Sequence, residues 1–234
     1  MPEGYYHVHT RGNDRRPIYF GNWSGRLFVR ELERTTRRHS WRILAYCLMG
    51  NHYHLVLQID ERLSQAMCEL NARFARISNW VNKRSDHLFG ARFRSHLIED
   101  EAYLFESLRY VLLNPVRARV VRHPGNWRWA SYAATVGRAP SPPCVDVDGL
   151  LELFGATRLR ARAQFQRFVE DGIGRTLAVP RPVPAHACSR LPDDRENLVT
   201  LRFHERLRAR LEVQAQERLG VRRTDVEVPV VGDN

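Results

Sequence analysis

The order of the secondary-structure elements that the hydrophobic pattern predicts is the strongest constraint on this fold. Alternating apolar residues are typical of strands, and apolar residues that recur every three or four positions are typical of amphipathic helices. The predicted elements, in chain order, are a strand at 5–10, a helix at 26–38, strands at 41–50 and 51–59, a helix at 62–84, a strand at 92–99 and a helix at 101–114. The first six have the order of a split βαβ unit.

This order predicts an α+β fold with a ferredoxin-like antiparallel sheet. In that topology the first and third strands lie side by side in the middle of the sheet. We expect helices to cover one face and to leave the other face open to a ligand, with a small helical extension at the C-terminal end. A fold class of this kind does not by itself assign a function.

A proline-rich stretch at residues 139–144 predicts the boundary of a first domain, which then covers residues 1–138. Residues 145–234 are expected to form a basic helical region, with a long Arg/Glu-rich helix near 194–219. Because the basic region holds no candidate metal-binding cluster, we expect it to assist binding and not chemistry. A chain shortened to residue 138 is then expected to remain active.

The charge balance favours a nucleic-acid partner. The chain has 37 basic and 26 acidic residues, a formal net charge of +11 and a single lysine, Lys83. Arginine binds phosphate in a bidentate manner and stacks on bases, so the surplus suits a nucleic acid better than a generic acidic surface. A GC-rich genome explains the choice of arginine over lysine, but it does not explain the excess of positive charge.

Cysteine spacing and hydropathy exclude several other classes. The four cysteines form no CxxC pair, which predicts neither a zinc finger nor a disulfide framework. No apolar stretch follows the N-terminal methionine, and no segment approaches 18 apolar residues. We therefore expect a cytoplasmic, nucleoid-associated protein without a membrane partner.

The stretch MGNHYHLVLQ at residues 49–58 places two histidines one residue apart in a predicted strand. Residues i and i+2 of a strand point to the same face, so His52 and His54 are expected to lie side by side. Such a pair can be half of a metal site, or simply two polar residues at the end of a strand. The spacing alone does not choose between these readings.

The helix predicted at 101–114 carries a second pair of polar residues. Tyr110 and Asn114 are four positions apart and share a helical face, although Pro115 disfavours regular helical geometry at Asn114. A phenol beside a divalent metal can attack a phosphate and form a phosphotyrosine. The alternative is a tyrosine that packs at the edge of the helix.

Four segments resemble, in order, the signatures of the single-tyrosine HUH transposases, and in particular the REP-associated tyrosine transposases related to insertion-sequence 200-like enzymes. The resemblance covers about residues 4 to 135 and lies in YHVHTRGNDRRPIY, MGNHYHLV, HLFGARFRSHLIED and LRYVLLNPVRARVV. It implies a transposase, that is, a metal-dependent endonuclease and strand transferase for single-stranded DNA. Such an enzyme cuts beside a REP-like or transposon-end hairpin through a 5′-phosphotyrosine intermediate, with Mg²⁺ or Mn²⁺.

The resemblance also implies roles for individual residues. Tyr110 matches the nucleophile, His52 and His54 match two metal ligands, and Asn114 falls where the family places a third ligand oxygen. His7 matches a histidine of the first-strand motif. His9 departs from the family pattern and gives the first strand its own HxH pair.

Four arginines are candidates for contact with the DNA. Arg92 and Arg94 flank Phe93 on the last predicted strand, and Arg73 and Arg76 lie on the polar side of the helix at 62–84. Backbone phosphates are the expected partners of these side chains, and splayed bases are expected to stack on aromatic residues. The sequence is consistent with a monomer and with a homodimer.

Two alternatives from other classes stay open. One is a domesticated protein that recognises hairpin DNA without cutting it. The other is a metal-dependent hydrolase built on His7, His9, His52 and His54. A covalent DNA adduct separates the first alternative from a transposase. Activity that survives the loss of Tyr110 would favour the second.

Overall fold

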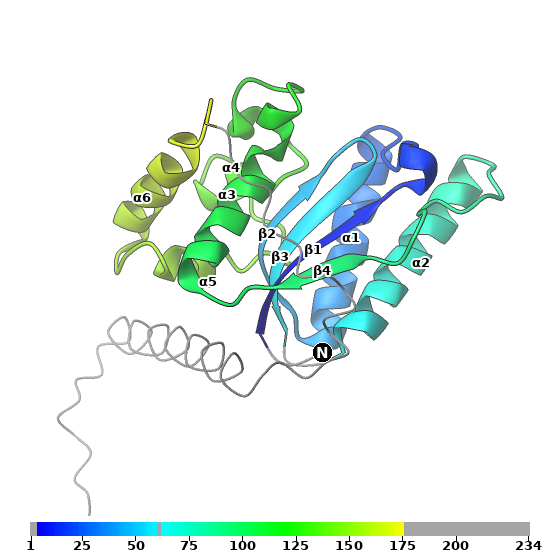
Figure 1. Ribbon diagram of the computed structural model, residues 1–234, viewed down its shortest axis with the longest axis horizontal. Helices are drawn as coiled ribbons and strands as arrows, with labels where there is room; N and C mark the ends of the chain where they lie inside the picture. Colours follow the sequence, from blue (N-terminus) through cyan, green and yellow to red (C-terminus); the bar gives the residue numbers. More distant parts are fainter. Residues whose placement is uncertain (1–3, 60–61, 176–234) are drawn as a thin grey trace, which may run out of the picture.

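A four-stranded antiparallel sheet forms the centre of the molecule, as a computed structural model of residues 4–59 and 62–175 shows (Figure 1). The strand order is β2-β3-β1-β4, which places the first and third strands in the middle as predicted. The strands are β1 (Gly4–Arg11), β2 (Arg42–Leu48), β3 (His52–Ile59) and β4 (Arg94–Leu97). This topology confirms the α+β, ferredoxin-like prediction.

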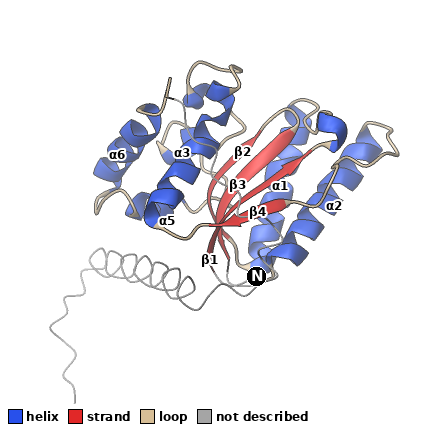
Figure 2. Ribbon diagram, in the orientation of Figure 1, coloured by secondary structure: helices blue, strands red, loops and turns tan. Residues whose placement is uncertain are grey.

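Helices α1 (Asn22–His39) and α2 (Leu63–Val81) cover one face of the sheet (Figure 2). An aromatic cluster fills the space between the layers: the ring of Phe28 lies 4.8 Å from that of Tyr53 and 5.7 Å from that of Phe74. Helix α1 begins four residues earlier than predicted. Gly25 lies in this added turn, and only glycine fits there because a Cβ would lie 2.6 Å from the ring of Trp129.

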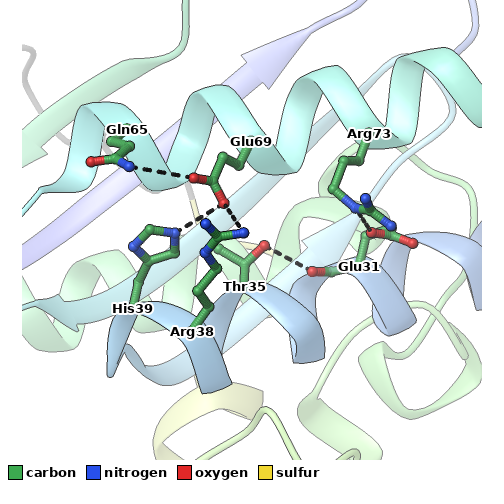
Figure 3. Close-up of polar contacts among 7 residues, drawn as sticks. All are labelled: Glu31, Thr35, Arg38, His39, Gln65, Glu69 and Arg73. Atoms are coloured by element: carbon green, nitrogen blue, oxygen red, sulfur yellow. Dashed lines mark hydrogen bonds and ion pairs between the residues drawn. The ribbon is translucent and has the colours of Figure 1, made fainter.

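Polar contacts also join α1 to α2 (Figure 3). The carboxylate of Glu31, which is buried, accepts a 2.7 Å hydrogen bond from Nε of Arg73. Near the other end of the pair, Glu69 lies 3.2 Å from His39 and 3.5 Å from Arg38. Arg73 is therefore a structural link between two helices.

The second face of the sheet is more covered than predicted. Helix α3 (Glu101–Arg117) packs against β2 and β3. Asp100 caps it as expected, since its carboxylate accepts a 2.7 Å hydrogen bond from the amide of Tyr103. The helix continues past Pro115, and the amide of Ala118 donates to the carbonyl of Asn114 at 2.9 Å. Pro115 is accommodated at the last turn, so Asn114 keeps regular helical hydrogen bonding.

The stretch at 139–144 does not separate two packed units within the described residues. Immediately after it, Val145 pairs with Ile43 of β2, and Asp146 forms an ion pair with Arg42 at 2.6 Å. Side chains of the following helices join the same core as the sheet. These following helices are α5 (Val147–Glu152) and α6 (Arg158–Glu170). The short helix α4 (Tyr132–Thr135) and the 3₁₀ turns η1 (Asn13–Arg15) and η2 (Pro124–Asn126) lie earlier in the chain.

One sequence prediction concerns the remaining part of the chain. The long helix expected near 194–219 lies outside the described residues. Among the residues that the structure describes, none of the helices combines the length and the apolar character needed to span a bilayer.

Candidate active site

Helix α3 places Tyr110 and Asn114 against the histidines of β3. The amide oxygen of Asn114 lies 3.3 Å from Nε2 of His52. The ring of Tyr110 lies edge-on to that of His54, with 5.6 Å between centroids. The structure therefore brings together the four residues that the sequence pattern and the family resemblance single out.

Hydrogen bonds fix the orientation of both imidazoles of β3. Nδ1 of His54 lies 3.0 Å from Nε2 of His7, and Nδ1 of His52 lies 2.7 Å from the side-chain oxygen of Asn51. In each ring this leaves Nε2 as the nitrogen that can face a ligand. A partner that holds one imidazole nitrogen commonly orients the other toward a metal. His7 is therefore placed to orient the imidazole of His54.

Strands β1 and β4 add further histidines to the HxH pair of β3. His9 lies opposite His54 across the β1–β3 ladder, and His96 of β4 lies opposite His7. Ring centroids of neighbouring members are 5.1 to 6.0 Å apart. We call these five residues, His7, His9, His52, His54 and His96, the histidine cluster.

Burial favours the neutral form of four of these imidazoles, those of His7, His9, His52 and His54. It lowers the pKa of His7 to about 3 and that of His9 to about 4, with smaller contributions from neighbouring histidines. Burial also lowers the pKa of His54 and His52 below the usual value. A neutral imidazole has a free lone pair, which is the form that binds a metal.

The donor atoms of His52, His54 and Asn114 suit a divalent cation. Two ligands of one cation lie roughly 3 Å apart when each bond is about 2.1 Å, and Nε2 of His52 and the Asn114 oxygen are separated by 3.3 Å. Two imidazoles and an amide oxygen also match the preference of Mn²⁺ for mixed nitrogen and oxygen ligands. Among the described residues, no three His, Cys, Asp or Glu side chains are already gathered as a metal-binding group.

Arginines surround this site. Arg11 pairs with His52 across the β1–β3 ladder, and Arg94 pairs with His9 across the β1–β4 ladder. The guanidinium of Arg117 lies over the ring of Tyr110, 4.4 Å from its centroid. A phosphodiester that enters here would meet positive charge from three elements.

The four arginines predicted to contact DNA fall into two groups. Arg94 is exposed beside the histidine cluster, and Arg92 is exposed in the loop before β4, outside the strand predicted for it. Arg73 and Arg76 belong to α2, on the other side of the sheet. Arg73 is engaged by Glu31 there, while Arg76 is exposed. The exposure of Arg92 and Arg94, at or just before β4, favours these two over Arg73 and Arg76 as contacts to DNA.

Sequence reasoning missed three residues at this site: His96, Arg11 and Arg117. The antiparallel register would have placed His96 and Arg11, because each lies directly across from a histidine. Arg117 follows Tyr110 by seven residues, about two helical turns, and therefore returns to the same side of α3. Its signal was hidden by the expectation that the helix ends at residue 114.

Comparisons with known proteins find similarity to one group of transposases. Residues 1–111 match the profile of the family described as IS200-like transposases. A REP-associated tyrosine transposase of Haemophilus influenzae is 24% identical over 131 residues, which are 51% of this chain and 74% of that protein. A solved structure of the REP-associated tyrosine transposase bound to a REP hairpin shares the fold, with a TM-score of 0.51, 18% identity, and coverage of 63% of this chain and 88% of the other. Residues 1–111 of this chain are therefore similar to the IS200-like transposase family.

Proposed function

We propose that this protein cuts and rejoins single-stranded DNA beside a hairpin, with Tyr110 as the nucleophile. The observation that carries the proposal is the position of α3, which sets Tyr110 and Asn114 against His54 and His52. A REP-like or transposon-end hairpin is the substrate we infer, because a relative of the same fold is named as bound to a REP hairpin. Chromosomal DNA in the cytoplasm is the corresponding place of action.

We assign the divalent cation, Mg²⁺ or Mn²⁺, to His52, His54 and Asn114. When bound, the cation would polarise the scissile phosphate and stabilise the charge that develops on its oxygens. His7 and Asn51 hold the two imidazoles in the required orientation through their Nδ1 atoms. The neutral state of the rings means that no proton has to be displaced when the cation binds.

The chemistry of Tyr110 then follows from its place on α3. Its phenolic oxygen attacks the phosphorus in line, a new oxygen–phosphorus bond forms, and the bond to the 3′-oxygen of the strand breaks. The products are a 5′-phosphotyrosine and a free 3′-hydroxyl. One phosphoester is exchanged for another, so attack by a second 3′-hydroxyl can reverse the step on a new strand. Arg11, Arg94 and Arg117 supply positive charge around the phosphodiester.

Neither alternative gains support from a specific observation. The hydrolase would use the first-strand histidines as metal ligands, yet Nε2 of His7 is hydrogen-bonded to Nδ1 of His54. No carboxylate completes a three-residue metal group in the described part of the chain. A binding-only protein would have no use for the alignment of Tyr110 and Asn114 with the β3 histidines.

The test uses a labelled hairpin with a single-stranded flank from the DNA beside the gene, incubated with the full chain and Mn²⁺. We expect a shorter labelled strand and a covalent protein–DNA adduct. Asn114→Ala is expected to slow cleavage or to change the ratio of the rates with Mn²⁺ and Mg²⁺, since it removes one oxygen ligand. Asn126→Ala, in η2, is the matched control.

Each remaining outcome counts against the proposal. Tight hairpin binding without cleavage, over a range of flanks and with both cations, would identify the domesticated binding protein. Cleavage that leaves no adduct and yields a free 5′-phosphate would identify the hydrolase.

A further inference from the structure

An arginine-lined pocket lies outside the catalytic site. It has a volume of about 530 Å³ and is formed by one side of α1, the segment 125–142 and Tyr46 of β2. Cavities of this size are typical of sites for small molecules and single nucleotides. None of Tyr110, Asn114, His52 or His54 contributes to its lining.

The charge of the pocket is strongly positive. Arg26 and Arg30 project from α1, and Arg128 and Arg138 from the opposite wall. All four are exposed, and Glu33 is the only acidic residue of the lining. Glu33 already pairs with Arg37 at 3.1 Å, so its charge is compensated from outside the arginine set. Four exposed guanidinium groups around one cavity create a positive potential that attracts an anion.

The floor and walls have a different character. Trp129 and Tyr46 are buried there, and Ala130, Ala133 and Ala134 contribute only methyl groups. The guanidinium of Arg128 lies over the ring of Trp129 at 4.7 Å, which holds that side chain at the edge of the pocket. A ligand with a flat apolar part and an anionic part would satisfy both the floor and the rim. A nucleotide has both parts.

The position of the pocket connects it to the sheet that carries the active site. Ala130 pairs with Cys47 at the outer edge of β2, and Cys47 lies opposite His54 on β3. Tyr46, the residue before Cys47 on β2, points to the α1 side of the sheet and lines the pocket. The pocket therefore lies beside β2, the strand that neighbours the histidine-bearing β3, but it opens on the opposite face of the sheet.

We propose that this pocket holds one unpaired nucleotide of the single-stranded flank of the DNA, with its phosphate on the arginines and its base on the apolar floor. This inference rests on the proposed function, because it takes DNA as the substrate. A base-paired stem is too wide to enter a cavity of this size, whereas a splayed nucleotide fits. Proteins usually hold single-stranded nucleic acids in two ways. Arginine side chains form bidentate hydrogen bonds to phosphates, and bases stack on aromatic or apolar surfaces.

The test compares two DNA ligands, a bare hairpin and the same hairpin with a single-stranded flank, by fluorescence anisotropy. The double variant Arg128→Ala/Arg138→Ala should lose about tenfold or more in affinity for the flanked hairpin and little for the bare one. Its salt dependence should also be shallower, by a slope of about one for each lost phosphate contact. Arg122→Ala/Arg160→Ala removes the same charge from exposed positions outside the pocket and should affect both ligands equally and weakly.

A second variant tests the cavity without removing charge. Ala133→Leu fills the apolar part of the pocket and should lower the affinity for the flanked hairpin, while the thermal unfolding temperature checks that the fold is retained. Equal losses for both ligands, or losses no larger than those of the control pair, would overturn the inference. Because binding is measured without divalent metal, a failure of cleavage would refute the proposed function and leave this result unaffected.

Discussion

The two faces of the central sheet are made by alternate residues of the same strands, and they have opposite characters. On β3, Tyr53, Leu55 and Leu57 point toward α1 and α2 and are fully buried in an apolar layer. His52 and His54 point to the other face, toward α3. The alternation places apolar core residues on one face and the proposed catalytic residues on the other. Substitutions on the two faces should therefore have separable effects.

The largest effect is expected from removal of the layer behind α3. A chain shortened to residue 138 loses α5 and α6, whose side chains belong to the common core, and the stacking of Arg109 on Phe168 at 3.9 Å. We now expect this chain to lose its cooperative thermal transition, contrary to the expectation from sequence that it stays active. A chain that ends at residue 175 keeps every described element and is the control. A shortened chain that melts cooperatively and cuts DNA would show that the second face needs only α3.

The apolar face should be far more sensitive than the histidine face. Phe74→Ala removes a ring buried between α2 and the sheet and should lower the free energy of unfolding by about 3–5 kcal/mol. His9→Ala should change it by less than about 1 kcal/mol, because His9 is half-buried and its Nδ1 has no hydrogen-bond partner among the described residues. Urea unfolding measures both. Similar losses in the free energy of unfolding for the two variants would contradict the claim that the two faces have separate roles.

A smaller and sharper contrast uses two arginines from opposite faces. Arg73→Ala leaves the buried carboxylate of Glu31 without its closest partner and should cost about 1–3 kcal/mol of stability, with hairpin affinity unchanged. Arg94→Ala should leave stability unchanged and weaken hairpin binding by about 1–2 kcal/mol, because the side chain is exposed beside the histidine cluster. A loss of DNA affinity in Arg73→Ala, in a variant that remains folded, would restore Arg73 as a DNA contact.

Much of the fold could be predicted because the spacing of apolar residues along the sequence indicates each strand and helix. The strand and helix patterns gave the element order, and this order allows few sheet topologies. The position of Asp100 gave the start of α3, since a capping carboxylate acts on the next three residues. The end of α3 was predicted too early because the helix accommodates Pro115 and continues for two more residues, to Arg117.

The site was predictable only where its residues are close in sequence. The pair at 52 and 54 and the pair at 110 and 114 each share a face by simple periodicity. The bond between His7 and His54 depends on strand register, and the place of Arg94 beside His9 depends on it as well. The role of α5 and α6 in the core depends on tertiary packing, which a proline-rich stretch at 139–144 conceals.

The most direct test of the account is the identity of the residue that becomes attached to DNA. The full chain is incubated with Mn²⁺ and a hairpin with a single-stranded flank, and the adduct is digested and mapped by mass spectrometry. We predict a phosphotyrosine at Tyr110, and we predict that Tyr110→Phe binds the hairpin as tightly as the parent but forms no adduct and does not cut. The variant Tyr103→Phe, on the same helix, should form the adduct normally. A phosphotyrosine at Tyr103, or full cleavage by Tyr110→Phe, would contradict the account.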